Sequence, residues 1–225
     1  MKQQMLQWER QLYSKGRVAD KYDILERMRL ELDRLYTHDR TTYDECRAAL
    51  KTNTWDALEK LWTLWNPTPT SHVDWVGPNK FTCVLKPSHP GYAECAEVGF
   101  VKCQYDEHGG PDFSQVTCPG TVVDISDLYD SLTANEIDKR GGSADSLQEI
   151  AQMRMAENLK QVIEKWAQDN NRKPDFWAWR DAQDLVPHED ANCRTMRLVS
   201  RAAHDVFKHR GGVANAVMVK THFPS

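Results

Sequence analysis

Two prolines in the segment Asn66-Pro67-Thr68-Pro69-Thr70 limit the fold more than any other local feature of this sequence. Proline lacks a backbone N–H and disfavours helical geometry in the residue before it, so a helix cannot run through this segment. The sequence before the prolines has a helical periodicity, whereas the sequence after them is rich in turn residues and β-branched residues. We therefore expect a boundary between a helical part and a part of mixed structure.

Residues 1–65 are predicted to be helical because their apolar residues recur at intervals of three and four. Leu25, Met28, Leu32 and Leu35 fall on one helical face, and a second run from about residue 41 to residue 65 repeats the pattern. We expect a helical hairpin or small bundle. It serves either as a packing module or as a delivery or docking segment.

Residues 70–225 are predicted to mix strands and helices, so the expected fold class is α+β. Gly and Pro clusters separate three short β-branched or apolar runs, which predict strands at 81–85, 99–103 and 122–125. A long helix is expected at 143–170 and a short aromatic helix at 175–183. A further pair of extended pieces and a helix follow between residues 185 and 212.

Composition excludes several classes of protein. The 29 basic and 33 acidic residues leave a net charge of −4, which excludes a protein that coats nucleic acid by bulk charge. No apolar run approaches the roughly 20 residues needed to cross a bilayer. The first fifteen residues lack the apolar core of a signal peptide. The six cysteines form no Cys-x-x-Cys pair, so reduced thiols are favoured over a structural zinc site.

The charge is distributed unevenly along the chain. Residues 104–187 carry 16 acidic and 8 basic side chains, whereas residues 188–225 carry 6 basic and 3 acidic ones. This basic C-terminal segment also holds four of the eight histidines. A local basic site is therefore compatible with the acidic total.

The C-terminal segment contains the residues best suited to chemistry. A strand–turn–strand–helix order can bring His188 or Glu189 next to His204 around one metal ion. Such an ion suits phosphodiester cleavage, because it can stabilise charge on a phosphate oxygen while a base activates water. Four cationic residues near this cluster are candidate phosphate-binding groups: Arg194, Arg197, Lys208 and Arg210. The alternative is a pair of surface histidines without a ligand.

This segment resembles the WHH-type toxin branch of the HNH (ββα-metal) nuclease superfamily. The matching residues are His188-Glu189, Thr195-Met196-Arg197-Leu198-Val199, His204 and His209-Arg210-Gly211-Gly212. The segment from Pro111 to Ser114, followed by Val122 to Ile125, looks like the strand that precedes the core in these toxins. The resemblance covers roughly residues 93–216. The expected domains are therefore the helical segment at 1–65, which the resemblance suggests is a delivery or docking segment, and a nuclease toxin domain at 70–225, with a helical insert at 129–180 and a ββα core at 185–212.

The resemblance also implies roles for individual residues. His188 and His204 match metal ligands, and His209 matches a trailing histidine that holds metal or phosphate. Glu189 stands where a histidine base is expected, so the expected catalytic residues are Glu189, His188 and His209. Glu189 could act as the base, or it could bind the metal while His188 accepts the proton. Pro187, Glu189 and Ser200 depart from the family pattern, so a nuclease fold without activity is a third reading.

The function expected from the resemblance is DNA cleavage by an antibacterial toxin that uses one divalent ion (Mg, Zn, Mn or Ni). The resemblance further implies a cognate immunity protein and delivery into the cytoplasm of a target cell. A secretion-system chaperone or adaptor could bind the N-terminal helices, and no membrane partner is expected. The alternatives are a ribonuclease on the same core and an inactive, protein-binding fold.

Asp190 is expected to be solvated or to cap a helix, and His222 to lie in a frayed tail.

Overall fold

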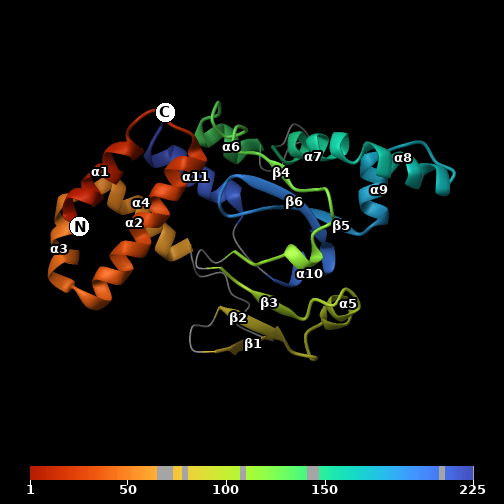
Figure 1. Ribbon diagram of the computed structural model, residues 1–225, viewed down its shortest axis with the longest axis horizontal. Helices are drawn as coiled ribbons and strands as arrows, with labels where there is room; N and C mark the ends of the chain where they lie inside the picture. Colours follow the sequence, from red (N-terminus) through yellow and green to blue (C-terminus); the bar gives the residue numbers. More distant parts are fainter. Residues whose placement is uncertain (65–72, 78–80, 107–109, 141–146, 208–210, 225) are drawn as a thin grey trace.

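The computed structural model describes residues 1–64, 73–77, 81–106, 110–140, 147–207 and 211–224. Its architecture is α+β: α1–α4 and α11 lie on one side of the view in Figure 1, α7–α9 lie on the other side, and the small antiparallel sheets lie between and below them. The fold class expected from the sequence is therefore confirmed. None of the helices in the described residues is long and apolar enough to span a membrane.

The described N-terminal residues form successive helices, as expected from their periodicity. These helices are α1 (Lys2–Leu12), α2 (Val18–His38), α3 (Arg40–Ala49) and α4 (Thr52–Leu64). The four residues of α2 assigned to one face, Leu25, Met28, Leu32 and Leu35, are all buried. The run from residue 41 to 65 is two helices, because Leu50 adopts an extended backbone and turns its side chain into the core. The carboxylate of Glu9 then accepts the backbone N–H of Lys51 at 2.8 Å, where α4 begins.

The described strands form two three-stranded antiparallel sheets. The first sheet has the order β1 (Val73–Val76), β2 (Thr82–Leu85), β3 (Lys102–Gln104), and the helix α5 (Tyr92–Glu97) lies between β2 and β3 in the chain. The second has the order β4 (Val123–Asp124), β6 (Thr195–Ser200), β5 (Leu185–Glu189). The segment at Pro111–Ser114 leads into a short 3-10 helix, η1 (Ser114–Val116), so its predicted strand character is wrong.

The residues between β4 and β5 are helical. The helices are α6 (Ala134–Arg140), α7 (Leu147–Asn158), α8 (Lys160–Asp169) and α9 (Phe176–Ala182). The single helix predicted at 143–170 is interrupted at Leu159, and residues 143–146 of that prediction lie outside the described residues. The buried face of α7 contains Leu147, Ala151 and Met155, whereas Met153 is 61% exposed. The chain changes direction after Asn158, so the buried face of α8 does not continue the buried face of α7.

The chain ends in two helices, α10 (Arg201–Val206) and α11 (Gly212–His222). The frayed tail expected around His222 is wrong, because α11 packs against α2, α4 and α6 and the His222 side chain is buried. The sequence of α11 shows no helical periodicity, because apolar residues are spread over nearly all of its sides. This pattern is typical of a helix enclosed by its neighbours. Figure 1 shows α11 beside α2, so both ends of the chain share one core.

The sheet β4–β6–β5 lies between two separate hydrophobic cores. Successive residues of a strand point to opposite faces, and the two faces here contact different groups of residues. Met196 and Leu198 pack into the larger core with the N-terminal helices and α11. Val199 packs into the smaller core, which contains residues of the first sheet, α5 and α10. The direction of a side chain on β5 or β6 therefore decides which core it meets.

Candidate active site

The hairpin β5–β6 followed by α10 gives the strand–turn–strand–helix order that the sequence predicts. In its antiparallel register, His188 lies opposite Arg197, and Glu189 lies opposite Met196. Directly opposite residues share a face of the sheet. His188 and Arg197 consequently point to the side of the smaller core, while Glu189 points to the side of the larger one.

The structure brings His188 and His204 together. Helix α10 packs against both strands of the hairpin, and the two imidazole ring centres are 5.8 Å apart. Phe113 contacts both rings, with its centre 4.8 Å from that of His188 and 6.0 Å from that of His204. His188 is 3% exposed, so this ring is held rigidly, and the His204 side chain is 29% exposed.

Asp190 joins this site although the sequence favoured a solvated or capping role. Its carboxylate lies 3.3 Å from His188 Nε2 and 2.5 Å from the guanidinium of Arg197, and it also accepts a hydrogen bond from Thr195. Burial raises the pKa of Asp190, but the hydrogen bonds from His188, Thr195 and Arg197 outweigh it, so the net pKa is lowered. Asp190 is therefore ionised and fixes the orientation of His188.

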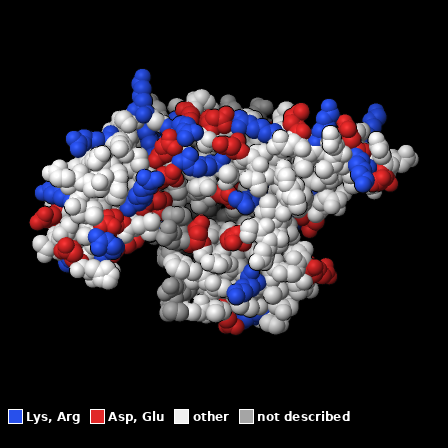
Figure 2. All heavy atoms as spheres, viewed as in Figure 1, with Lys and Arg blue, Asp and Glu red and all other residues white. Residues whose placement is uncertain are grey.

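A cleft of about 480 Å³ opens beside His188. Asp106, Asp112 and Asp190 contribute carboxylates to its lining, and Arg197 contributes a guanidinium. Charged groups of both signs also alternate over the molecular face drawn in Figure 2. Among the described residues that line this cleft, the carboxylates outnumber the guanidinium of Arg197, so the cleft is not a broad basic surface of the kind that attracts a polyanion.

Glu189 is not brought to His188 and His204. Its side chain is buried on the opposite face of β5, where the hydroxyl of Tyr129 donates a hydrogen bond to Oε2 at 2.8 Å. Burial raises the pKa of Glu189, and hydrogen bonds from Tyr129 and the backbone N–H of Val213 offset part of that rise. Its buried Oε1 atom has no hydrogen-bond partner among the described residues. The arrangement makes Glu189 a polar group inside the larger core.

The replacement Glu189→Gln is expected to stabilise the protein at neutral and alkaline pH. The raised pKa means that the folded state favours the protonated carboxyl group, so its contribution to stability is complete below the ordinary value of 4.5 and is lost as the pH rises through the folded-state pKa. A neutral amide avoids this loss. Thermal unfolding between pH 4 and pH 8 should show the variant a few degrees more stable at pH 8, with the difference vanishing near pH 4. A variant that is less stable at pH 8 would contradict this assignment.

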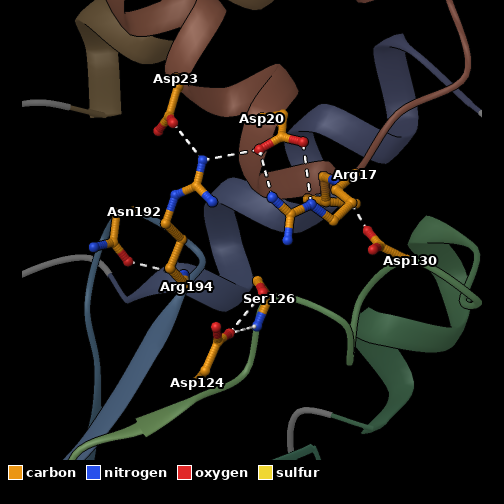
Figure 3. A network of polar contacts seen from close by, with 9 residues as sticks. Arg17, Asp20, Asp23, Asp124, Ser126, Asp130, Asn192 and Arg194 are labelled. Carbon is orange, nitrogen blue, oxygen red and sulfur yellow. Dashed lines mark hydrogen bonds and ion pairs between the residues drawn. The ribbon is translucent and has the colours of Figure 1, made fainter.

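Arg194, a predicted phosphate-binding residue, makes the partly exposed ion pairs shown in Figure 3. Its guanidinium pairs with Asp20 at 3.0 Å and also with Asp23, both on α2. Burial lowers the pKa of Arg194, but hydrogen bonds to Asp23 and Asp20 outweigh it and raise the pKa overall. Arg194 therefore ties the turn between β5 and β6 to the N-terminal helices, and its phosphate role stays a prediction.

The other predicted residues divide into two groups. Arg197 lines the cleft as the sequence suggested, although it is already paired with Asp190. Lys208, His209 and Arg210 lie outside the described residues, so their predicted roles remain predictions.

Cys193 lies in the hairpin turn with φ = 57° and is fully buried, and its pKa is raised well above the ordinary value by burial. A thiol in this state is not a nucleophile.

His188 and His204 have the donor chemistry and spacing for a divalent ion. Two imidazoles bound to one zinc ion at about 2 Å place their ring centres roughly 5–6 Å apart, close to the separation found here. When Nε2 of His188 donates its proton to Asp190, Nδ1 becomes the metal-binding nitrogen, an arrangement common among histidine ligands. The described residues contain no group of three His, Cys, Asp or Glu side chains around one point. The resemblance supplies a third ligand in His209.

Sequence reasoning missed Asp190 and Phe113 as parts of this site. The signal for Asp190 was its position two residues after His188, which places both side chains on one face of an extended segment. Phe113 had no comparable signal, because it reaches the histidines through a contact distant in sequence. Such contacts follow only from the tertiary structure.

Comparison with known proteins adds no assignment. No family description, curated protein or solved structure matches this chain. The fold and site define an α+β protein in which a β-hairpin and a short helix bring two histidines together, and in which one of them, His188, lines a cleft together with Asp190.

Proposed function

We propose that this protein is a metal-dependent endonuclease that cleaves DNA phosphodiester bonds. The observation that carries the proposal is the meeting of His188 and His204 on a hairpin–helix unit beside the cleft. This order of elements and these two residues are the ones that the sequence shares with the WHH-type nucleases. Imidazole nitrogens are common ligands of divalent ions, and both imidazoles are carried by elements of regular structure.

His188, His204, Asp190 and Arg197 each have a role in this proposal. His188 and His204 would hold the divalent ion, and Asp190 orients His188 through its hydrogen bond to Nε2. The ion would supply positive charge for a non-bridging phosphate oxygen. Arg197 lies opposite His188 across the hairpin, so its guanidinium can bind an adjacent phosphate. Glu189 takes no part, because its carboxylate faces the larger core.

The biological setting is proposed on the resemblance alone. It comprises an antibacterial effector delivered into the cytoplasm of a target cell and a cognate immunity protein that blocks the cleft. An adaptor or chaperone at the N-terminal helices would belong to the delivery step.

An inactive fold that binds another protein is the second candidate, and the position of Glu189 favours it. The family places its general base at this point of the sequence, and here the residue is buried against Tyr129 on the other side of the sheet. A fold that has lost its base but kept its framework would look the same in the described residues. The two candidates differ in activity, so a cleavage assay separates them.

The test is incubation of the purified protein with plasmid DNA and with RNA. Each substrate is combined in turn with magnesium, manganese, zinc, nickel or a chelator. We expect nicking and linearisation of the plasmid with at least one metal, and no cleavage with the chelator, because phosphate binding in this cleft depends on a bound cation. Cleavage of RNA alone would replace the proposal by a ribonuclease. Absence of cleavage under every condition would support the protein-binding fold.

A further inference from the structure

Two cysteines face each other across the first sheet. Strands β2 and β3 are antiparallel neighbours, and their register places Cys83 directly opposite Cys103 (Figure 1). Directly opposite residues share one face of a sheet, so the two side chains point the same way. Both side chains are fully buried in the smaller hydrophobic core. The proposed cleavage site uses neither of them.

The backbone spacing of this pair suits a disulfide. Two positions further along the strands, Leu85 donates its backbone N–H to the carbonyl oxygen of Val101 at 2.8 Å. Hydrogen-bonded pairs recur at every second residue of an antiparallel ladder, so Cys83 and Cys103 also form such a pair. The Cα atoms of a hydrogen-bonded pair are about 5.5 Å apart. Disulfides join Cα atoms that are about 4.4–6.8 Å apart, so the sheet already holds the two cysteines at a suitable distance.

The two thiols also affect each other. Burial raises the pKa of Cys103, and the neighbouring Cys83 raises it further. Burial raises the pKa of Cys83 to about 11, although its sulfur accepts a hydrogen bond from the backbone of Cys103, which offsets part of the rise. Both thiols are therefore protonated in the folded protein at neutral pH. Because the thiolate is the form that attacks a disulfide, the pair reacts most readily while the sheet is open, as the chain folds.

The other cysteines are placed less favourably. Cys95 on α5 also lies in the smaller core, but its Sγ atom donates a hydrogen bond to the carbonyl oxygen of Ala202 on α10 at 3.4 Å. The remaining three cysteines pack in or against the larger core: Cys46, Cys118 and Cys193. The fold therefore favours one pairing over the others.

We propose that Cys83 and Cys103 form a disulfide when the chain folds in the presence of a disulfide oxidant such as oxidised glutathione. The thiolate of one cysteine attacks oxidised glutathione, forms a mixed disulfide and releases one reduced glutathione. The thiolate of the other cysteine then attacks the mixed disulfide, which forms the protein disulfide and releases the second glutathione. The two cysteines lose two protons and two electrons, and the oxidant takes up both.

The bond would fix one wall of the cleft. It joins β2 to β3 directly, and Gln104 and Tyr105, which follow Cys103 in the chain, line the cleft. Movement of β3 away from β2 is no longer possible once the two strands are covalently joined. This effect on the cleft wall is independent of whether the protein cleaves DNA.

The experiment refolds the full-length protein with a mixture of reduced and oxidised glutathione, and in parallel with a reducing agent alone. Free thiols are blocked with N-ethylmaleimide in denaturant and counted by mass spectrometry. All six cysteines should be blocked in the reduced sample, and two fewer in the oxidised one. Cys83→Ala and Cys103→Ala should each leave every remaining thiol free in both samples. The matched control Cys95→Ala removes a buried thiol of the same core and should still form the bond.

Oxidation of the wild type should also raise the midpoint of thermal unfolding by about 5 °C, because the bond closes a loop of about 20 residues in the unfolded chain. Three results would overturn the proposal. They are six blocked thiols in both wild-type samples, loss of the bond in Cys95→Ala, and equal unfolding midpoints of the oxidised and reduced wild type. The thiol count of the wild type does not depend on whether a variant folds. None of these measurements involves cleavage, so failure here is distinguishable from failure of the nuclease proposal.

Discussion

Replacing His204 with alanine is expected to lower plasmid cleavage by more than about 100-fold, with little change in stability. The imidazole is one of the two that would hold the ion, and loss of even a supporting contact at a metal site commonly costs 10–100-fold in affinity or activity. Its side chain is 29% exposed, so its removal leaves no large cavity. Cleavage rates over a range of metal concentrations and a thermal unfolding curve measure both effects.

The matched control is His38→Ala, which removes an exposed imidazole at the end of α2. This control variant should cleave at the wild-type rate. Equal cleavage by His204→Ala and wild type would remove His204 from the site and with it the observation on which the proposal rests. Loss of cleavage together with a large fall in the unfolding midpoint would instead assign His204 to folding.

Replacing Gly212 with alanine is expected to destabilise the protein by about 2 kcal/mol. A Cβ atom at this position would lie 2.7 Å from the backbone oxygen of Asp190 and 3.5 Å from Cα of Cys193. Both are backbone atoms of the hairpin turn, so neither can rotate away. The turn or the start of α11 must move, and for a protein of this size the unfolding midpoint should fall by about 4–8 °C. Differential scanning calorimetry measures the shift.

Gly16→Ala provides the control for Gly212→Ala, since the nearest atom to an added Cβ there is 4.0 Å away. It should change the midpoint little. Gly212→Ala should also reduce cleavage, because movement of Asp190 disturbs the group that orients His188. Equal stability of the two alanine variants would show that the turn is not held tightly against α11.

The same contact explains the second glycine of the pair Gly211-Gly212. Helix α11 begins at Gly212, and Cys193 donates a hydrogen bond from Sγ to the Gly212 carbonyl oxygen at 3.2 Å. The close approach of two backbones requires a residue without a side chain. The motif therefore has a packing reason that is independent of catalysis.

The sequence predicted those parts of the fold that depend on local patterns. Turn residues and periodicity indicated the α+β class, the N-terminal helices and the order of strands and helix around His188. These local patterns did not predict features of the structure that depend on tertiary contacts. Leu50 breaks a helix because its side chain reaches the core, and α11 is apolar all round because three other helices enclose it.

The candidate site shows the same division. The proximity of His188 and His204 follows from the hairpin–helix order, which the sequence contains. Glu189 is separated from the two histidines because the two faces of the sheet pack against different hydrophobic cores. The adjacent residues His188 and Glu189 do not by themselves indicate which core lies on which face. The pairing of Arg194 was unforeseen for a related reason, since its partners Asp20 and Asp23 lie about 170 residues earlier in the chain; its phosphate role stays a prediction.

The packing of α11 against α2 and α4 has a consequence for the order of folding during synthesis. Lys21 and Asn53 each hydrogen-bond to a backbone oxygen near the end of α11, those of Phe223 and His222 respectively. The ribosome makes α2 and α4 before α11, so these helices cannot complete their shared core until α11 is translated. Until then the apolar residues of α2 and α4 that pack on α11 lack this partner.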